Sequence, residues 1–211
     1  IASAPSSDFA FFGASMDEVR QHFASDRLCE LAASPKAPPP PPSTPAPPGL
    51  PPSPPSPSPA PPSPPACVVK LELVLVLDKS GSVRAEQSSL LAFAREMVSQ
   101  FRLDATEGAR VGVVEFSSDA ATLTPLTGSL SDVLTAIDGA SAAGGGTSVS
   151  DGLELGRAEV NRGARADVPR TILLLTDGVQ TVDGNDDTAI AKAAAVKQDG
   201  VSIVAVGFGG A

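Results

Sequence analysis

The chain has 211 residues, of which 42% are hydrophobic, and a formal net charge of −9. This length suits one globular domain with additional segments. The acidic balance, with no basic patch, argues against nucleic acid and anionic membrane surfaces as partners. Residues 67–211 alone carry 12 Lys and Arg against 19 Asp and Glu, so the domain that we expect there is itself acidic.

The first segment, residues 1–34, is too short for a stable core of its own. Ser15–Glu18 has the form of a helix capping box, which predicts a helix from Met16 to about Ala33. We therefore expect a short helical segment that can be the end of an upstream domain.

Residues 35–66 hold 19 of the 22 prolines of the chain. Because proline lacks an amide donor and has a fixed φ, this linker should be a polyproline II rod of roughly 100 Å. A stiff rod would keep Cys29 and Cys67 apart, so no disulfide is expected between them. The run Pro51–Pro59 resembles the hydroxyproline-rich glycoproteins of plant and green-algal walls, pherophorins and extensins, and the resemblance implies O-glycosylation outside the cell. A plain spacer or a ligand for SH3-type domains is the alternative.

From residue 67 onward, strand patterns alternate with helix patterns. The expected strands are Leu71–Leu77, Val111–Ser117, a short edge strand Ala120–Thr124 ended by Pro125, Arg170–Thr176 and Val201–Phe208. The expected helices are Ala85–Phe101, Leu130–Asp138, Ser150–Asn161 (weakened by Gly152 and Gly156) and Thr188–Gln198, with Thr188 as N-cap and Gly200 as C′ residue. The alternation predicts an α/β fold: a doubly wound, mainly parallel sheet with helices on both faces. Ligands of such sheets bind at the carboxyl ends of the strands.

Short oxygen-bearing side chains gather at those ends. The strand Leu71–Leu77 is followed by Asp78, Ser80 and Ser82 at alternate positions of a turn; Thr147 follows three glycines, and Asp177 follows another strand. Two aspartates bring a charge of about −2 and three hydroxyls add neutral ligands, which suits Mg²⁺ or Mn²⁺. Lys79 is expected to be solvated.

In this order, the three segments resemble the metal-ion-dependent adhesion site of von Willebrand factor type A domains. The resemblance covers about residues 67–211. It implies that Ser80, Ser82 and Thr147 contact the metal, that Asp78 and Asp177 act largely through water, and that an acidic side chain of a partner protein fills an open metal position.

Each residue also has a purely structural interpretation. Asp78 and Ser82 can cap the following helix, Thr147 or Ser150 can be an ordinary N-cap, and Asp177-Gly178 can be an ordinary turn.

Catalysis is not expected. The segment Gly146–Val149 is faintly similar to the surroundings of a subtilase nucleophile, but residues 67–211 contain no histidine to act as base. The hydrophobic strand that runs into Asp78 is also similar to haloacid dehalogenase-type phosphatases. Those enzymes need a second aspartate two residues later, where this chain has Ser80. The glycines 144–146 lack the lysine of a P-loop.

The resemblance also implies a helix, a strand and a terminal helix after Phe208, and the absence of that strand would leave an open sheet edge. We expect a metal-dependent protein-binding or adhesion module on an extracellular proline-rich stalk. The alternatives are a structural wall or matrix glycoprotein with incidental metal binding, and an intracellular scaffold.

Overall fold

The computed structural model describes residues 9–13, 67–140 and 144–208. The expected helix from Met16 to Ala33 and the linker 35–66 lie outside these ranges. Six strands form one sheet in the order β1-β6-β5-β2-β3-β4, and all neighbours are parallel except the pair β3 and β4. The strands are β1 (Phe9–Gly13), β2 (Leu71–Asp78), β3 (Ala109–Phe116), β4 (Ala120–Thr127), β5 (Arg170–Thr176) and β6 (Ser202–Phe208).

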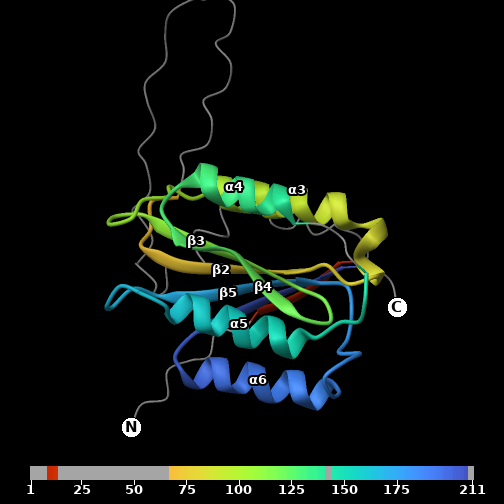
Figure 1. Ribbon diagram of the computed structural model, residues 1–211. Coiled ribbons are helices and arrows are strands. Elements are labelled where there is room, and N and C mark those ends of the chain that lie inside the picture. Colours follow the sequence, from red (N-terminus) through yellow and green to blue (C-terminus); the bar gives the residue numbers. More distant parts are fainter. Residues whose placement is uncertain (1–8, 14–66, 141–143, 209–211) are drawn as a thin grey trace, which may run out of the picture.

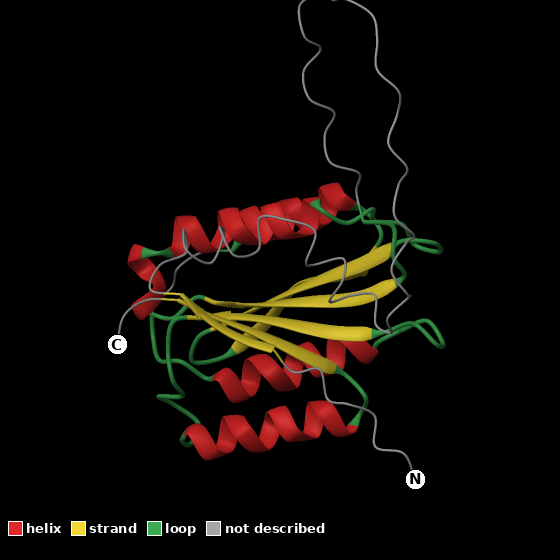
Figure 2. Cartoon of the chain, turned by 180° about the vertical axis from the view of Figure 1, so that it is seen from behind, coloured by secondary structure: helices red, strands yellow, loops and turns green. Residues whose placement is uncertain are grey.

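Helices cover both faces of the sheet, as Figure 1 and the reverse view in Figure 2 show. They are the 3₁₀ helix η1 (Ser82–Ala85) and the α-helices α3 (Gln87–Ser99), α4 (Leu130–Gly139), α5 (Val149–Asn161) and α6 (Asp186–Gln198). The helices α3 and α4 lie on one face and α5 and α6 on the other. The doubly wound α/β class expected from the sequence is confirmed. In the described part of the chain, no helix has the length and apolarity needed to cross a membrane.

The central strand β2 explains why the sequence folds into two layers of helix. Every residue of β2 is buried. Because side chains alternate along a strand, its leucines at 71, 73, 75 and 77 join the core beneath α3 and α4. Val74 and Val76 join the core beneath α5 and α6. A nearly continuous run of branched apolar residues is what a strand buried on both faces requires.

The helix α5 lies unusually close to the sheet. A Cβ added to Gly152 would lie 2.8 Å from Phe116 Cδ1, and one added to Gly156 would lie 2.8 Å from Val76 Cγ2. The two glycines were expected only to weaken this helix. In the structure they leave room for the side chains of β2 and β3 directly below.

Two local expectations are wrong. Pro125 does not end β4, because the pairing of β3 with β4 shifts register between Val113↔Thr124 and Val111↔Thr127, and the proline lies inside this irregularity, where no ladder bond is required. Thr188 is not the N-cap of α6. Asn185 accepts the capping hydrogen bond, and Thr188 is the third helical residue of a capping box.

The sheet edge beside β6, which was expected to be open, is occupied. The strand β1 pairs with β6 in parallel, from Phe9↔Val204 to Gly13↔Phe208. This strand lies in the segment 1–34 and was not expected from the sequence.

The sequence led us to expect no disulfide between Cys29 and Cys67, whereas Cys67 is disulfide-bonded. The other cysteine of the chain is Cys29, which lies outside the described residues. A rod between the two cysteines would separate them only if the segment before it were a separate body, whereas Phe9–Gly13 of that segment pair with the sheet.

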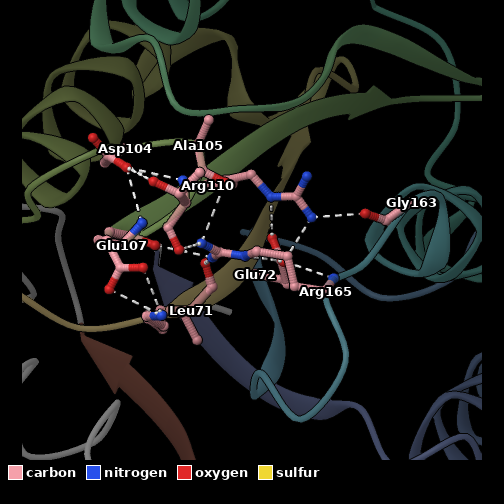
Figure 3. Close-up of polar contacts among 11 residues, drawn as sticks. Leu71, Glu72, Asp104, Ala105, Glu107, Arg110, Gly163 and Arg165 are labelled. Carbon is pink, nitrogen blue, oxygen red and sulfur yellow. Dashed lines mark hydrogen bonds and ion pairs between the residues drawn. The ribbon is translucent and has the colours of Figure 1, made fainter.

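A buried ion cluster fastens the amino end of β2 (Figure 3). Glu72 is fully buried, and Arg110 donates to both of its carboxylate oxygens, at 2.9 and 2.6 Å. Arg165 Nε donates to Glu72 Oε1 at 2.8 Å, and its Nη2 donates to the carbonyl of Gly108 at 2.9 Å. Burial alone would raise the pKa of Glu72, but the hydrogen bonds from the two arginines outweigh it and lower that pKa.

Candidate metal centre

Asp78 ends β2 and lies at the carboxyl end of the sheet, where the residue is 2% exposed. Its Oδ1 accepts from the amide of Ser80 at 2.8 Å, and its Oδ2 accepts from the hydroxyl of Thr176, the last residue of β5, at 2.6 Å. Burial raises the pKa of Asp78, the neighbouring Asp177 adds to this, and the hydrogen bonds from Thr176 and Ser80 oppose it. A cation beside this carboxylate would favour its ionised form.

Three side chains form a hydrogen-bonded row from the first loop to the third. The hydroxyls of Ser80 and Ser82 lie 3.0 Å apart, and Ser82 donates to Asp177 Oδ1 at 2.8 Å. Ser82 does not cap η1, because the N-cap position is Gly81 and no side-chain cap bond is present. The capping interpretation of Ser82 therefore does not hold, and its hydroxyl faces the third loop instead.

Thr147 supplies the second loop. A Cβ on Gly178 would lie 3.8 Å from both Thr147 Oγ1 and Ser82 Oγ, so these hydroxyls flank the same glycine. The N-cap of α5 is Ser148, which accepts from the amide of Asp151. The capping role expected of Thr147 or Ser150 thus belongs to the residue between them. Thr147 is 4% exposed, and within the described residues its hydroxyl makes no hydrogen bond.

Backbone hydrogen bonds hold the three loops together. The amide of Gly81 donates to the carbonyl of Gly145 at 3.3 Å, which joins the first loop to the second. Thr147 N donates to Thr181 Oγ1 at 2.7 Å, and Thr181 N donates to Thr147 O at 2.9 Å, which joins the second loop to the third. These bonds connect the three loops that carry the five residues.

The structure brings together all five residues that the sequence singled out, Asp78, Ser80, Ser82, Thr147 and Asp177; their assignment as metal ligands stays a prediction. Two carboxylates and three hydroxyls form an all-oxygen set that fits a hard divalent cation such as Mg²⁺ or Mn²⁺. Within the described residues, no group of three or more His, Cys, Asp and Glu side chains is placed to hold a metal. A cation at this edge would therefore depend on hydroxyl ligands.

Lys79 does not lie in solvent as expected. Its side chain is 21% exposed, and its Nζ lies 2.7 Å from Oε1 of Glu115, a side chain that is itself 10% exposed. Leu77 pairs with Glu115 in the sheet, so the strand register places this carboxylate beside the first loop. The charge of Lys79 is therefore balanced within the domain.

Two residues that support the loops, Gln180 and Ser118, were not expected from the sequence. Gln180 is buried, and its side chain accepts from Ser150 N at 3.0 Å and donates to Ser150 Oγ at 2.7 Å, which ties the third loop to the first turn of α5. Ser118 Oγ accepts from Gly146 N at 3.0 Å. Their positions beside the ends of strands could have indicated that they lie near the site. Their hydrogen-bond partners lie on other loops and could not be identified from the sequence.

Comparisons with known proteins agree with this fold. The collagen alpha-4(VI) chain of Mus musculus is 29% identical over 143 residues, which cover 66% of this chain and 6% of the collagen. Proximal thread matrix protein 1 from the mussel byssus, in a structure with a zinc-occupied MIDAS motif, has a TM-score of 0.60 and 28% identity over 67% of this chain and 36% of that one. The protein BatB from Bacteroides thetaiotaomicron has a TM-score of 0.54 and 25% identity over 65% and 66% of the two chains.

The chain thus spans only a small part of the two matrix proteins that it resembles. The family model of the von Willebrand factor type A domain matches residues 72–211, about two-thirds of the chain and all of its described helices. This family consists of binding and adhesion domains, so the expectation of a binding module rather than an enzyme is confirmed. The chain belongs to the von Willebrand factor type A domain family.

Proposed function

We propose that this domain binds a protein partner through a divalent cation held by Asp78, Ser80, Ser82, Thr147 and Asp177. One observation carries the proposal. The hydroxyls of Ser82 and Thr147 are not used to cap the helices that follow them, and they face the same glycine beside Asp177. If these two hydroxyls had a purely structural role as helix caps, they would accept hydrogen bonds from backbone amides in the first turns of η1 and α5.

In this proposal, the hydroxyl groups coordinate the cation and the two aspartates balance its charge. The hydroxyls of Ser80, Ser82 and Thr147 are neutral ligands, and Asp78 and Asp177 together balance a charge of about +2. Asp78 is oriented by hydrogen bonds from Ser80 and Thr176, so little reorganisation is needed on binding. A cation held mainly by neutral ligands supplies an electron-poor open position, which an acidic side chain of a partner can fill.

We place the domain outside the cell, in a matrix or wall. The relatives with which it shares 28–29% identity are a collagen VI chain and a byssal thread matrix protein. Cys67 is disulfide-bonded, which is typical of an oxidising compartment. The proline-rich residues 35–66 would act as a glycosylated stalk. These observations favour an adhesion or matrix role over an intracellular scaffold.

Calorimetry with Mg²⁺ and Mn²⁺ tests the metal site. Asp177→Asn keeps the size of the side chain and removes its charge, and we expect at least a tenfold loss of Mg²⁺ affinity, about 1.4 kcal/mol. Asp183→Asn is the matched control. Asp183 is an exposed neighbour with φ of 59°, a backbone conformation that asparagine also adopts.

Metal binding should also raise the thermal midpoint of the parent protein and of the Asp183 variant, because a ligand that binds only the folded state stabilises it. The Asp177 variant should show a much smaller rise. Equal Mg²⁺ affinity in all three proteins would overturn the proposal.

A further inference from the structure

A second charged group lies beside the candidate metal centre. Arg84 is exposed and follows Ser82 by two residues, within η1. Its Nη2 lies 3.2 Å from the position that a Cβ on Gly144 would take. Gly144 belongs to the loop that carries Thr147, so the guanidinium extends from the first loop across to the second.

This arginine has no counterion within the described part of the chain. Lys79, the other cation of the first loop, is paired with Glu115 at 2.7 Å and is largely buried. With a divalent cation balanced by Asp78 and Asp177, the charge of Arg84 would remain available at the rim of the site. A guanidinium binds carboxylates with two parallel hydrogen bonds, and arginines at interfaces are often energetic hot spots.

An apolar side chain accompanies the two charged positions. Val179 is 63% exposed, although it lies between Asp177 and the buried Gln180 on the third loop. The bonds of Gln180 to Ser150 hold this loop in place, so Val179 is presented to solvent from a fixed backbone. A partner can thus contact a cation, a guanidinium and an apolar group on three adjoining loops.

Acidic residues at the same edge restrict what can bind. Asp119 is exposed and adjoins Ser118, which accepts a hydrogen bond from Gly146. Asp183 is exposed just beyond Val182, whose side chain lies against Gly146. These carboxylates would repel an anionic polymer of high charge density. The surface suits a few placed carboxylates better than a sulfated glycan.

We propose that the partner is a protein segment with two carboxylates a few residues apart, one completing the shell of the metal and the other paired with Arg84. This inference rests on the proposed function, since the first carboxylate needs the cation. It adds a specificity-determining residue and a chemical class of ligand.

The test uses synthetic glycine-rich peptides that carry one glutamate or two glutamates at a series of spacings, titrated into the full chain with excess MgCl₂. At the best spacing, we expect the two-glutamate peptide to bind up to about 5-fold tighter than the single-glutamate peptide, the upper end of the gain from an exposed ion pair. Arg84→Gln should abolish this gain and leave the affinity for the single-glutamate peptide unchanged. Arg102→Gln, at an exposed arginine close to the amino end of β3, should preserve the gain.

A second readout separates recognition from damage to the metal site. Removing a positive charge near a cation should leave Mg²⁺ affinity unchanged or raise it, so Arg84→Gln should bind the metal at least as well as the parent. An equal loss of affinity for both peptides in Arg84→Gln would overturn the inference. So would equal affinities of the parent for both peptides at every spacing, although the proposed function would then stand.

Two other outcomes are decisive. If neither peptide binds in Mg²⁺, while calorimetry still shows a bound metal, the acidic-partner mechanism and the role of Arg84 both fail. If the two-glutamate peptide or heparin binds equally well in chelator, the surface is a general anion site and the inference is overturned.

Discussion

At the scale of single residues, charge is arranged differently at the two ends of the sheet. At the carboxyl end, Asp78 and Asp177 lie together with no cationic partner among the described residues, which leaves their charge for a ligand. At the amino end, Glu72 is buried but is paired with Arg110 and Arg165 (Figure 3). The first arrangement suits binding and the second suits stability.

Glu72→Gln should therefore destabilise the domain strongly. It leaves two largely buried arginines without their counterion, and breaking a buried pair typically costs about 3–5 kcal/mol in the free energy of unfolding. Glu107→Gln is the matched control, because Glu107 pairs with Lys70 at the same end of the sheet but both side chains are well exposed, at 69% and 48%. This change should cost less than about 1 kcal/mol. Urea titrations at pH 7 measure both.

The contribution of Glu72 should also depend on pH. Its folded pKa lies below the ordinary value of 4.5, so the folded state favours the ionised form. This stabilisation is complete above the unfolded pKa and is lost as the pH falls below about 4.5 through the folded pKa. The difference in unfolding free energy between the parent and Glu72→Gln should shrink between pH 7 and pH 3. A constant difference would contradict an electrostatic role for Glu72.

At the scale of elements, the contact of α5 with the sheet sets the position of Thr147, which lies two residues before the helix begins. Gly152→Ala would normally favour a helix by about 1 kcal/mol. Here the new methyl group would lie 2.8 Å from Phe116 and 3.1 Å from Val76, so we expect a net destabilisation of about 1–3 kcal/mol.

Gly139→Ala provides the comparison, because Gly139 ends α4 and an added Cβ would meet nothing within 4 Å. Its unfolding free energy should be equal to that of the parent or higher. If Gly152→Ala were also stabilising in thermal or urea unfolding, α5 could not lie as close to the sheet as the structure shows.

The elements were predictable to the extent that their signals are local. The run of leucine and valine in β2 indicated a doubly buried strand, and Asp78 and Asp177 were identified because each follows such a strand. The cap of α5 was not predictable, since Thr147, Ser148 and Ser150 offer similar hydroxyls and only the backbone geometry selects Ser148. The pairing of Lys79 with Glu115 depends on the register of two strands, which no local pattern encodes.

At the scale of the whole molecule, β1 protects the edge of the sheet beside β6. An exposed strand edge is a template for association with other chains, and β1 covers it with five residues. This strand was missed because Phe9–Gly13 is short and its partner lies at the other end of the sequence.

Two proline substitutions in β1 test whether this strand pairs with β6. Successive backbone amides of a strand point to opposite sides, so only one of Ala10→Pro and Phe11→Pro removes a hydrogen bond to β6. Ala10→Pro is compared with the parent and Phe11→Pro with Phe11→Ala, so that each comparison changes an alanine to a proline. We expect one of the two proline variants to lose about 1 kcal/mol of stability and to self-associate at high concentration, while the other resembles its reference protein. Unfolding titrations combined with light scattering would show this. If neither variant differed from its reference protein, β1 would not pair with β6 in solution.

The position of β1 also has a kinetic consequence. Phe9 pairs with Val204, so the last strand contact of the sheet joins residues from nearly opposite ends of the chain. Folding slows as the average sequence separation of contacts grows, and during synthesis the first residues emerge long before their partners. The sheet from β2 to β6 can assemble without β1, whereas β1 must wait for β6 to be made. Newly made chains therefore pass through an interval in which the β6 edge is accessible to other chains, and fast docking of β1 matters most when many chains are made close together.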